Sequence, residues 1–255
     1  MEQVTSNLIK RDIVNRVLVL QLNAHHRHNP FSAEMERELT QCFRECDENT
    51  TDAVLITGGE DRSFSVGGDF NEVKEFEGGS EVDAWIEEII DMYVACLEIG
   101  KPTISALDHY VIGIGFQLAL CCDYRIGSTR CQLIMPELKH GIACVLGQYL
   151  LEKTLSRAHM QKIIIDSDRI SIHDCVNLGL LHGVCEPEDL NRQALVKAES
   201  LAQYPQVSYR ATKRAMNADF ICGLRSTIAV AQQAHRQSFK EQAAQRFMKT
   251  IVEKR

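Results

Sequence analysis

Hydrophobic residues in the first half of the chain form short apolar runs separated by longer segments with helical spacing. The apolar runs at residues 17–22, 53–57 and 102–107 predict buried strands. Residues 80–99 place apolar side chains three and four positions apart, which predicts a long amphipathic helix. Ser32 is typical of an N-cap, and the helix that follows it should reach about Cys46.

The second half of the chain becomes mostly helical. An apolar helix is expected at residues 113–122, short strands at 125–127 and 132–134, and helices beyond Gly147, with a break at Pro205. Alternating strands and helices followed by helices predict an α/β layered core with a helical C-terminal part. We place the division between residues 1–193 and 194–255. The sequence shows no internal repeat.

Composition narrows the class of protein. A chain of 255 residues with 45% hydrophobic residues is long enough for one large globular domain. The net charge of −7 and the pI of about 5.7 argue against nucleic acid as a partner. The acidic stretch at residues 72–88 is interpreted as a solvated helix face. Neither an apolar run long enough for a membrane span nor a signal-peptide pattern is found, which favours a cytoplasmic location.

The ten cysteines lie mainly inside apolar runs and lack the paired spacing of a zinc site. In a reducing cytoplasm they are expected to act as small buried hydrophobic residues. No metal site is expected.

Two glycine-containing turns carry the first indication of chemistry, at residues 63–70 (SFSVGGDF) and 111–117 (VIGIGFQ). Glycine lets backbone N–H groups approach a ligand closely, and a helix that begins near Gly113 aims free N–H groups at whatever lies there. Two such groups from separate turns can bind one oxyanion. The alternative for Gly67 and Gly68 is a packing role alone.

These turns, residues 101–126 and residues 135–142 (MPELKHGI) together resemble the crotonase (enoyl-CoA hydratase/isomerase) superfamily, over nearly the whole chain. The resemblance implies the crotonase fold, a repeated ββα spiral core with a C-terminal helical trimerisation region. It also implies self-association to a trimer or hexamer. A coenzyme A thioester is then the substrate, with no tightly bound cofactor.

Residues 27–32 (RHNPFS), 62–74, 83–93 (DAWIEEIIDMY), 115–120 and 135–142 resemble more closely the crotonases that make carboxymethylproline for carbapenem antibiotics. The resemblance implies a reaction in three steps. Malonyl-CoA is decarboxylated to an enolate, the enolate adds to pyrroline-5-carboxylate, and the thioester is hydrolysed.

The same resemblance implies catalytic roles for four residues. The N–H groups of Gly68 and Ile114 are expected to bind the thioester oxygen, and Glu137 is expected to exchange protons, because burial near an apolar pocket raises a carboxyl pKa. Gln117 stands where hydratases hold a second glutamate. An amide cannot act as a general acid or base, so simple hydration is not expected.

Further residues are candidates for substrate contacts. Trp85 either lines the acyl pocket or packs in the core, and His140 either contacts substrate or orients its loop. His235 is a candidate contact for a substrate carboxylate, while the side chains of Val66 and Ile114 are expected to narrow the pocket.

Four residues are candidates for contacts with coenzyme A. Arg27 and His28 stand where the superfamily presents basic groups to its phosphates. Phe247 and Lys249 are candidates for contacts with the coenzyme A of a neighbouring subunit. All four are otherwise ordinary surface residues.

Three other functions stay open at this stage. A Δ3,Δ2-enoyl-CoA isomerase also needs one glutamate and an oxyanion site. A decarboxylase or dehydratase of polyketide assembly would act on an acyl carrier protein, for which a basic docking patch is expected. A non-catalytic member that binds RNA or acts as a scaffold would be expected to lack the glycine turns or Glu137.

Overall fold

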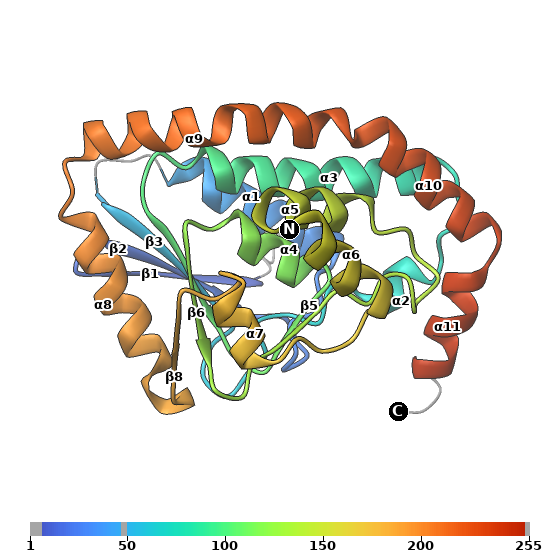
Figure 1. Ribbon diagram of the computed structural model, residues 1–255, viewed down its shortest axis with the longest axis horizontal. Helices are drawn as coiled ribbons and strands as arrows, with labels where there is room; N and C mark the ends of the chain where they lie inside the picture. The colour runs from blue at the N-terminus through green and yellow to red at the C-terminus, as the bar shows by residue number, and fades with distance from the viewer. Residues whose placement is uncertain (1–6, 47–49, 253–255) are drawn as a thin grey trace, which may run out of the picture.

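The computed structural model describes residues 7–46 and 50–252. Within these residues, six strands form one sheet in the order β1–β2–β3–β4–β6–β8 (Figure 1). The first pair is antiparallel and the other neighbours are parallel. The strands are β1 (Ile9–Val14), β2 (Val17–Leu22), β3 (Ala53–Thr57), β4 (Thr103–Leu107), β6 (Tyr124–Ser128) and β8 (Gly183–Cys185).

Short strands outside the large sheet form a second layer. Strands β5 (Tyr110–Ile112) and β7 (Gln132–Ile134) pair in parallel. The parallel bridges Phe31–Gly68 and Ser65–Val111 extend this layer toward earlier parts of the chain. Each unit of the spiral therefore runs from a strand of the large sheet through a strand of the second layer into a helix, as in β4–β5–α4 and β6–β7–α5. This is the expected spiral of ββα units.

Helices cover both faces of the large sheet. On one face lies the main core, with α1 (Ala33–Glu45), α3 (Ser80–Glu98), α4 (Ile114–Cys121) and α5 (Val145–Thr154). On the other face α8 (Leu190–Ala202) packs its alanines against apolar side chains of β2, β3, β4 and β6. The division predicted between residues 193 and 194 falls inside α8, because this helix begins at Leu190. The division into two parts stays a prediction.

The C-terminal helices run back along the molecule. Helix α9 (Gln206–Ser226) lies along α3, α10 (Ile228–Lys240) contacts α3 and α5, and α11 (Ala243–Val252) returns to α2 (Phe70–Val73) (Figure 1). Helix α6 (Arg157–Asp166) packs on α5, and α7 (Ile172–Asn177) follows it along the chain (Figure 1). Apolar residues from α2, α3, α10, α11 and the loop before α5 form a separate small cluster at this end: Val73, Val82, Ile142, Phe239, Ala244 and Met248.

The predicted elements are found at their expected places. Strands β2, β3 and β7 have the predicted bounds, and the Ser32 side chain caps α1 by accepting from the Met35 N–H at 3.2 Å. Pro205 stands at the N-cap of α9. The sequence did not indicate β1, β5, β8 or α2. Strand β1 is a mostly exposed edge strand, and the other three elements have only three or four residues, too few to show a period.

The cysteines are unpaired, as expected. Of the ten, all described, eight are buried, Cys144 is partly buried and Cys222 is exposed. Over residues 7–46 and 50–252 we find neither a helix long and apolar enough to cross a membrane nor a group of three potential metal ligands.

Candidate active site

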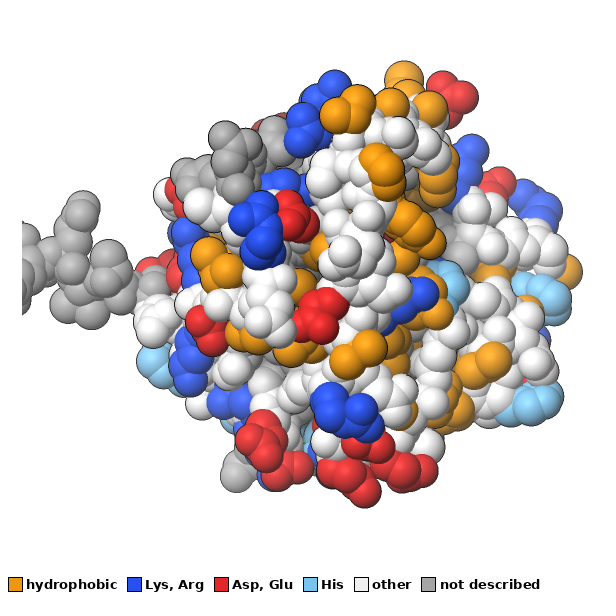
Figure 2. All heavy atoms as spheres, turned by 90° about the vertical axis from the view of Figure 1, so that its left-hand side faces the viewer, with side chains coloured by type: hydrophobic (Ala, Val, Ile, Leu, Met, Phe, Trp, Pro, Cys, Tyr) orange, Lys and Arg blue, Asp and Glu red, His pale blue; other side chains and the backbone are white. Residues whose placement is uncertain are grey.

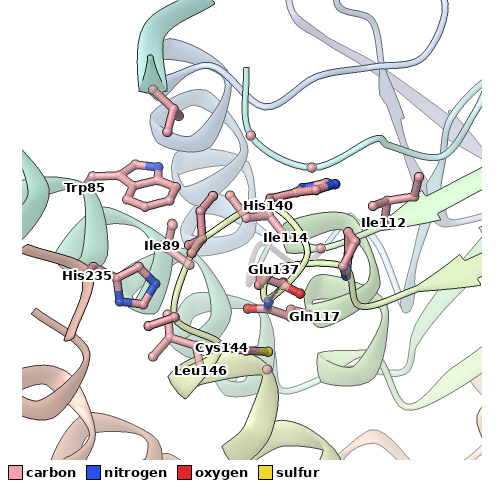
Figure 3. Close-up of a pocket in the computed structure, with 18 of the residues that line it drawn as sticks. Trp85, Ile89, Ile112, Ile114, Gln117, Glu137, His140, Cys144, Leu146 and His235 are labelled. Carbon is pink, nitrogen blue, oxygen red and sulfur yellow. Dashed lines mark hydrogen bonds between the residues drawn. The ribbon is translucent and has the colours of Figure 1, made fainter. Parts of the chain in front are cut away.

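The spiral brings three separate segments of the chain to one pocket (Figure 3). Ser65 pairs with Val111 and β5 pairs with β7, so the segments that continue from these strands lie side by side. The first continues to Gly68, the second to Ile114 and the third to Glu137, and all three line the pocket. Their proximity follows from the parallel register of the second layer.

Two residues that line this pocket have backbone N–H groups for which the described residues offer no acceptor. Among the described residues, neither the N–H of Gly68 nor that of Ile114 donates a backbone hydrogen bond. Ile114 is the first residue of α4, where helical N–H groups have no partner and the helix dipole is positive. A Cβ atom on Gly67 would lie only 3.8 Å from the Ile114 nitrogen, so the two turns touch. Two such donors can stabilise one negatively charged oxygen.

Glycine is required where the two turns approach each other. Gly67 and Gly113 have φ angles of +87° and +53°, which L side chains rarely adopt. A Cβ atom on Gly115 would meet the Cβ of Ser65 at 2.6 Å. The close approach of the two turns therefore explains why the sequence has glycines here. The same glycines allow both tight packing and the close approach of a ligand.

The Glu137 carboxylate is buried beside these donors. Its Oε1 accepts a hydrogen bond of 2.8 Å from the Gln117 amide nitrogen, while its buried Oε2 has no hydrogen-bond partner among the described residues. Burial raises the pKa of Glu137 to about 7, although the Gln117 amide opposes the shift. A carboxylate with this pKa can take and give protons near neutral pH.

Two residues around this carboxylate were not anticipated from the sequence. The Tyr93 hydroxyl donates to Gln117 Oε1 at 3.0 Å from behind the pocket. Cys144 lines the pocket, and burial together with the nearby Glu137 carboxylate raises the pKa of its thiol. Tyr93 follows the same helical spacing as other core residues, and Cys144 belongs to no motif. No sequence signal therefore marked either residue as part of the site.

Trp85 and His235 form the other end of the pocket (Figure 3). The indole makes edge contacts with Phe76 at 5.4 Å and with His235 at 6.0 Å between ring centres. Trp85 therefore packs against the small apolar cluster and lines the pocket at once. The His235 Nδ1 lies 2.7 Å from the Ala231 carbonyl oxygen, and burial lowers the pKa of the imidazole.

His140 lies between two aromatic rings in the wall of the pocket. Its ring stacks on Phe247 at 4.3 Å and meets Phe70 edge to face at 5.7 Å. Burial lowers the pKa of His140 to about 4, so the imidazole is uncharged at neutral pH. The side chain both lines the pocket and joins the Glu137 loop to α2 and α11.

Eight of the predicted site residues line the pocket, and the four candidate contacts for coenzyme A do not. Arg27 and Lys249 are exposed. His28 Nδ1 lies 2.7 Å from the Ser63 hydroxyl, and Phe247 packs on His140 of its own chain. Contacts of these four residues with coenzyme A stay predictions. Apart from Cys144, the other side chains that line the pocket are apolar, and the sequence did not indicate them as site residues: Phe70, Val73, Ile86, Ile89, Ile112, Pro136, Ile142, Ala143, Leu146 and Met248.

With this fold and pocket, the chain belongs to the enoyl-CoA hydratase/isomerase family, whose sequence model matches residues 12–255. It is an enzyme of the crotonase superfamily that acts on acyl-CoA thioesters. Carboxymethylproline synthase of Pectobacterium carotovorum subsp. carotovorum is 37% identical over 94% of this chain and 97% of that protein. Mitochondrial enoyl-CoA hydratase of Pongo abelii is 28% identical over 96% of this chain and 84% of that protein.

Solved structures agree with this assignment. ThnE from S. clavuligerus has a TM-score of 0.79 and 33% identity, covering 89% of this chain and 100% of that one. Enoyl-CoA hydratase from Bacillus halodurans has a TM-score of 0.87 and 18% identity, covering 95% and 99% of the two chains. The second similarity concerns the fold alone.

Proposed function

We propose that this enzyme condenses malonyl-CoA with pyrroline-5-carboxylate to form carboxymethylproline, a precursor of carbapenem-type antibiotics. The observation that carries the proposal is the pocket's single carboxylate. Among the described residues that line the pocket, only Glu137 is acidic, and the amide of Gln117 lies beside it. This arrangement argues against hydration with two acids, and the 37% identity with a carboxymethylproline synthase supports the synthase.

The first step is decarboxylation of malonyl-CoA. The bond between the carboxylate and the neighbouring carbon breaks, CO₂ leaves, and the electron pair forms a thioester enolate. The free N–H groups of Gly68 and Ile114 would hold the enolate oxygen. Because they bind this oxygen more strongly as its charge grows, they lower the barrier. No carboxylate of the protein needs to move a proton in this step.

The second step forms the new carbon–carbon bond. The enolate carbon attacks the carbon of the protonated C=N bond of pyrroline-5-carboxylate, and the π electrons move to nitrogen, which keeps its proton and becomes the neutral ring amine. The end of the pocket formed by Trp85 and His235 would hold the ring and its carboxylate. Ile114 and Val66 would restrict substituents on the malonyl carbon.

The third step is hydrolysis of the product thioester. Water adds to the thioester carbonyl as Glu137 takes its proton, the same two N–H groups hold the oxyanion, and the coenzyme A thiolate leaves and is protonated. Oε2 of Glu137 accepts no hydrogen bond from the residues that the structure describes, so it is the oxygen proposed to take the proton. Arg27, His28 and Lys249 are proposed to contact coenzyme A at the surface.

The experiment that tests the function is incubation of the purified protein with malonyl-CoA, with and without pyrroline-5-carboxylate, followed by mass spectrometry. Carboxymethylproline formed only with both substrates supports the proposal. Acetyl-CoA alone supports decarboxylation on the oxyanion site but with another acceptor. Unconsumed malonyl-CoA contradicts the proposal and favours the enoyl-CoA isomerase, which also needs one glutamate, to be assayed with a 3-enoyl-CoA.

Self-association to a trimer or hexamer is also proposed. Several large apolar side chains on α6, α9 and α10 are exposed, among them Ile165, Val207, Met216 and Val230. Figure 2 shows one face on which hydrophobic side chains lie exposed among charged ones. Exposed apolar surface of this kind is typical of subunit contacts. Light scattering coupled to size exclusion should give three or six times the chain mass, and a monomer would contradict the proposal.

A further inference from the structure

We infer that Tyr93 is a positioning residue that acts through Gln117: it holds the carboxamide with its N–H turned toward Glu137. The inference rests on the proposed role of Glu137 as the base of thioester hydrolysis. Tyr93 comes from the middle of α3, is fully buried and does not line the pocket. It therefore lies behind the site and contacts no substrate.

The contacts form a directed chain. Tyr93 O–H donates to Gln117 Oε1 at 3.0 Å, and Gln117 Nε2 donates to Glu137 Oε1 at 2.8 Å. An ionised carboxylate accepts only, so the nitrogen of the amide must face it. The amide oxygen then points away from the pocket, where the Tyr93 hydroxyl is its donor. Burial raises the pKa of Tyr93, so the phenol keeps its hydrogen.

The reversed amide is less well supported by its surroundings. If Gln117 turned its oxygen toward Glu137, its nitrogen would face Tyr93, whose hydrogen would have to turn to the Ile114 carbonyl. That carbonyl lies 3.5 Å away, longer than the contact with Gln117. The amide nitrogen would also lose its contact of 3.6 Å with the Met135 sulfur. Only a protonated Glu137 could donate to the reversed amide.

Tyr93 therefore biases Glu137 toward the ionised form, with Oε1 held and Oε2 free to receive a proton. Gly147 makes room for this arrangement, because a Cβ atom there would approach Gln117 Nε2 to 3.1 Å and Met135 Sδ to 2.9 Å. The amide thus serves a different purpose from the acid of a hydratase. It is a fixed donor whose direction is set from the core.

The test is to titrate Glu137 in the Tyr93→Phe variant by infrared spectroscopy. The carboxyl band of Glu137 is identified as the band that is missing in Glu137→Gln. Loss of one neutral hydrogen bond should move the titration midpoint upward by about 0.5–1 pH unit, a threefold to tenfold change in proton affinity. The thioester hydrolysis rate should fall by that factor below pH 7 and recover above pH 8, with KM unchanged. Gln117→Ala, which removes the donor, should shift the midpoint in the same direction.

Two controls separate this role from a structural one. Tyr149→Phe removes a phenol hydroxyl that donates to the Phe220 carbonyl at 2.9 Å, and it should leave the Glu137 titration in place. In a Gln117→Ala background, Tyr93→Phe should add no further shift. An unchanged midpoint in Tyr93→Phe, or an equal shift with and without Gln117, would overturn the inference. The titration needs no substrate, so it tests Tyr93 even if carboxymethylproline is not the product.

Discussion

At the scale of single residues, burial decides the charge of the groups in and near the pocket. It raises the pKa of Glu137 to about 7 and lowers that of His140 to about 4. Glu137 is therefore partly ionised at neutral pH, whereas His140 is neutral. Glu36 of α1 is a third case outside the pocket, since it is buried and neither carboxylate oxygen has a hydrogen-bond partner among the described residues.

Glu137→Gln should separate the proposed steps. Without the base, hydrolysis of the product thioester should fall roughly 10²- to 10⁴-fold, because general-base catalysis contributes about that much. Decarboxylation of malonyl-CoA should persist, and the thioester of carboxymethylproline should accumulate in the mass spectrum. In the unmodified enzyme, hydrolysis should increase with pH through about 7 as Glu137 ionises. The exposed Glu152→Gln is the control, and equal loss of decarboxylation in Glu137→Gln would contradict this division of steps.

Glu36→Gln should stabilise the protein above acidic pH. Burial raises the pKa of Glu36 well above its usual 4.5, and Glu88 and Glu72 raise it further. A raised carboxyl pKa means that stability is intact below pH 4.5 and is lost as pH rises toward the folded-state pKa, by about 1.4 kcal/mol per pH unit. Urea unfolding should show a gain for Glu36→Gln at pH 8 and almost none at pH 4.

The exposed Glu34 on the same helix provides the control for this measurement. Glu34→Gln should change the free energy of unfolding by less than about 1 kcal/mol at both pH values. Equal destabilisation of Glu36→Gln at pH 4 and pH 8 would show that the Glu36 carboxylate is not held neutral.

At the scale of elements, the site is made where helices begin and short strands end. Helix α4 contributes the N–H of Ile114 at its first residue and Gln117 one turn later. The turn that carries Gly68 is held against α4 by the contact between Ser65 and Gly115. The distance between the two N–H donors therefore depends on Gly115, which does not itself line the pocket.

Gly115→Ala should damage both stability and activity. The new Cβ atom would meet the Ser65 Cβ at 2.6 Å, and neither can move without its backbone. Overpacking of this kind costs about 1–3 kcal/mol of unfolding free energy. Displaced N–H donors should lower malonyl-CoA decarboxylation by roughly 10²-fold. Gly183→Ala is the control because nothing lies within 4 Å of its Cβ position, and undiminished activity of Gly115→Ala would contradict the argument.

At the scale of the whole molecule, the C-terminal helix closes one side of the pocket in its own chain. Met248 of α11 lines the pocket, and Phe247 stacks on His140 at 4.3 Å. Residues 66–73, which include α2, and the last described helix thereby meet at the site. The proposed contact of α11 with a neighbouring subunit's coenzyme A is compatible with this packing only for the side chains that face outward, such as Lys249.

Phe247→Ala should loosen α11 without unfolding the core. An aromatic pair contributes about 0.5–1.5 kcal/mol, so amide hydrogens in residues 243–250 should exchange roughly threefold to tenfold faster. The KM for malonyl-CoA should rise, because α11 forms part of the pocket wall. Arg246→Ala, an exposed change on the same helix, should leave exchange and KM nearly unaltered. If the amide hydrogens of α11 exchanged at the same rate in Phe247→Ala as in the unmodified protein, the ring stack would not be what holds the helix.

The sequence by itself determined the long elements and indicated the main residues of the candidate site. Apolar period and caps placed β2, β3, α1 and α3, because these signals are local. The glycine turns could be singled out because each motif lies within a few residues, and Glu137 was indicated by the family resemblance of residues 135–142.

Only the tertiary structure decided what lies together. Gly68, Ile114 and Glu137 meet because parallel strands of the second layer end side by side, in a spiral that leaves no repeat in the sequence. Tyr93 and Gln117 are twenty-four residues apart along the chain, and the place of Tyr93 behind Gln117 depends on how α3 packs against α4. Side chains brought together by such packing have no common local signal, so the support of the single carboxylate could not be predicted from the sequence.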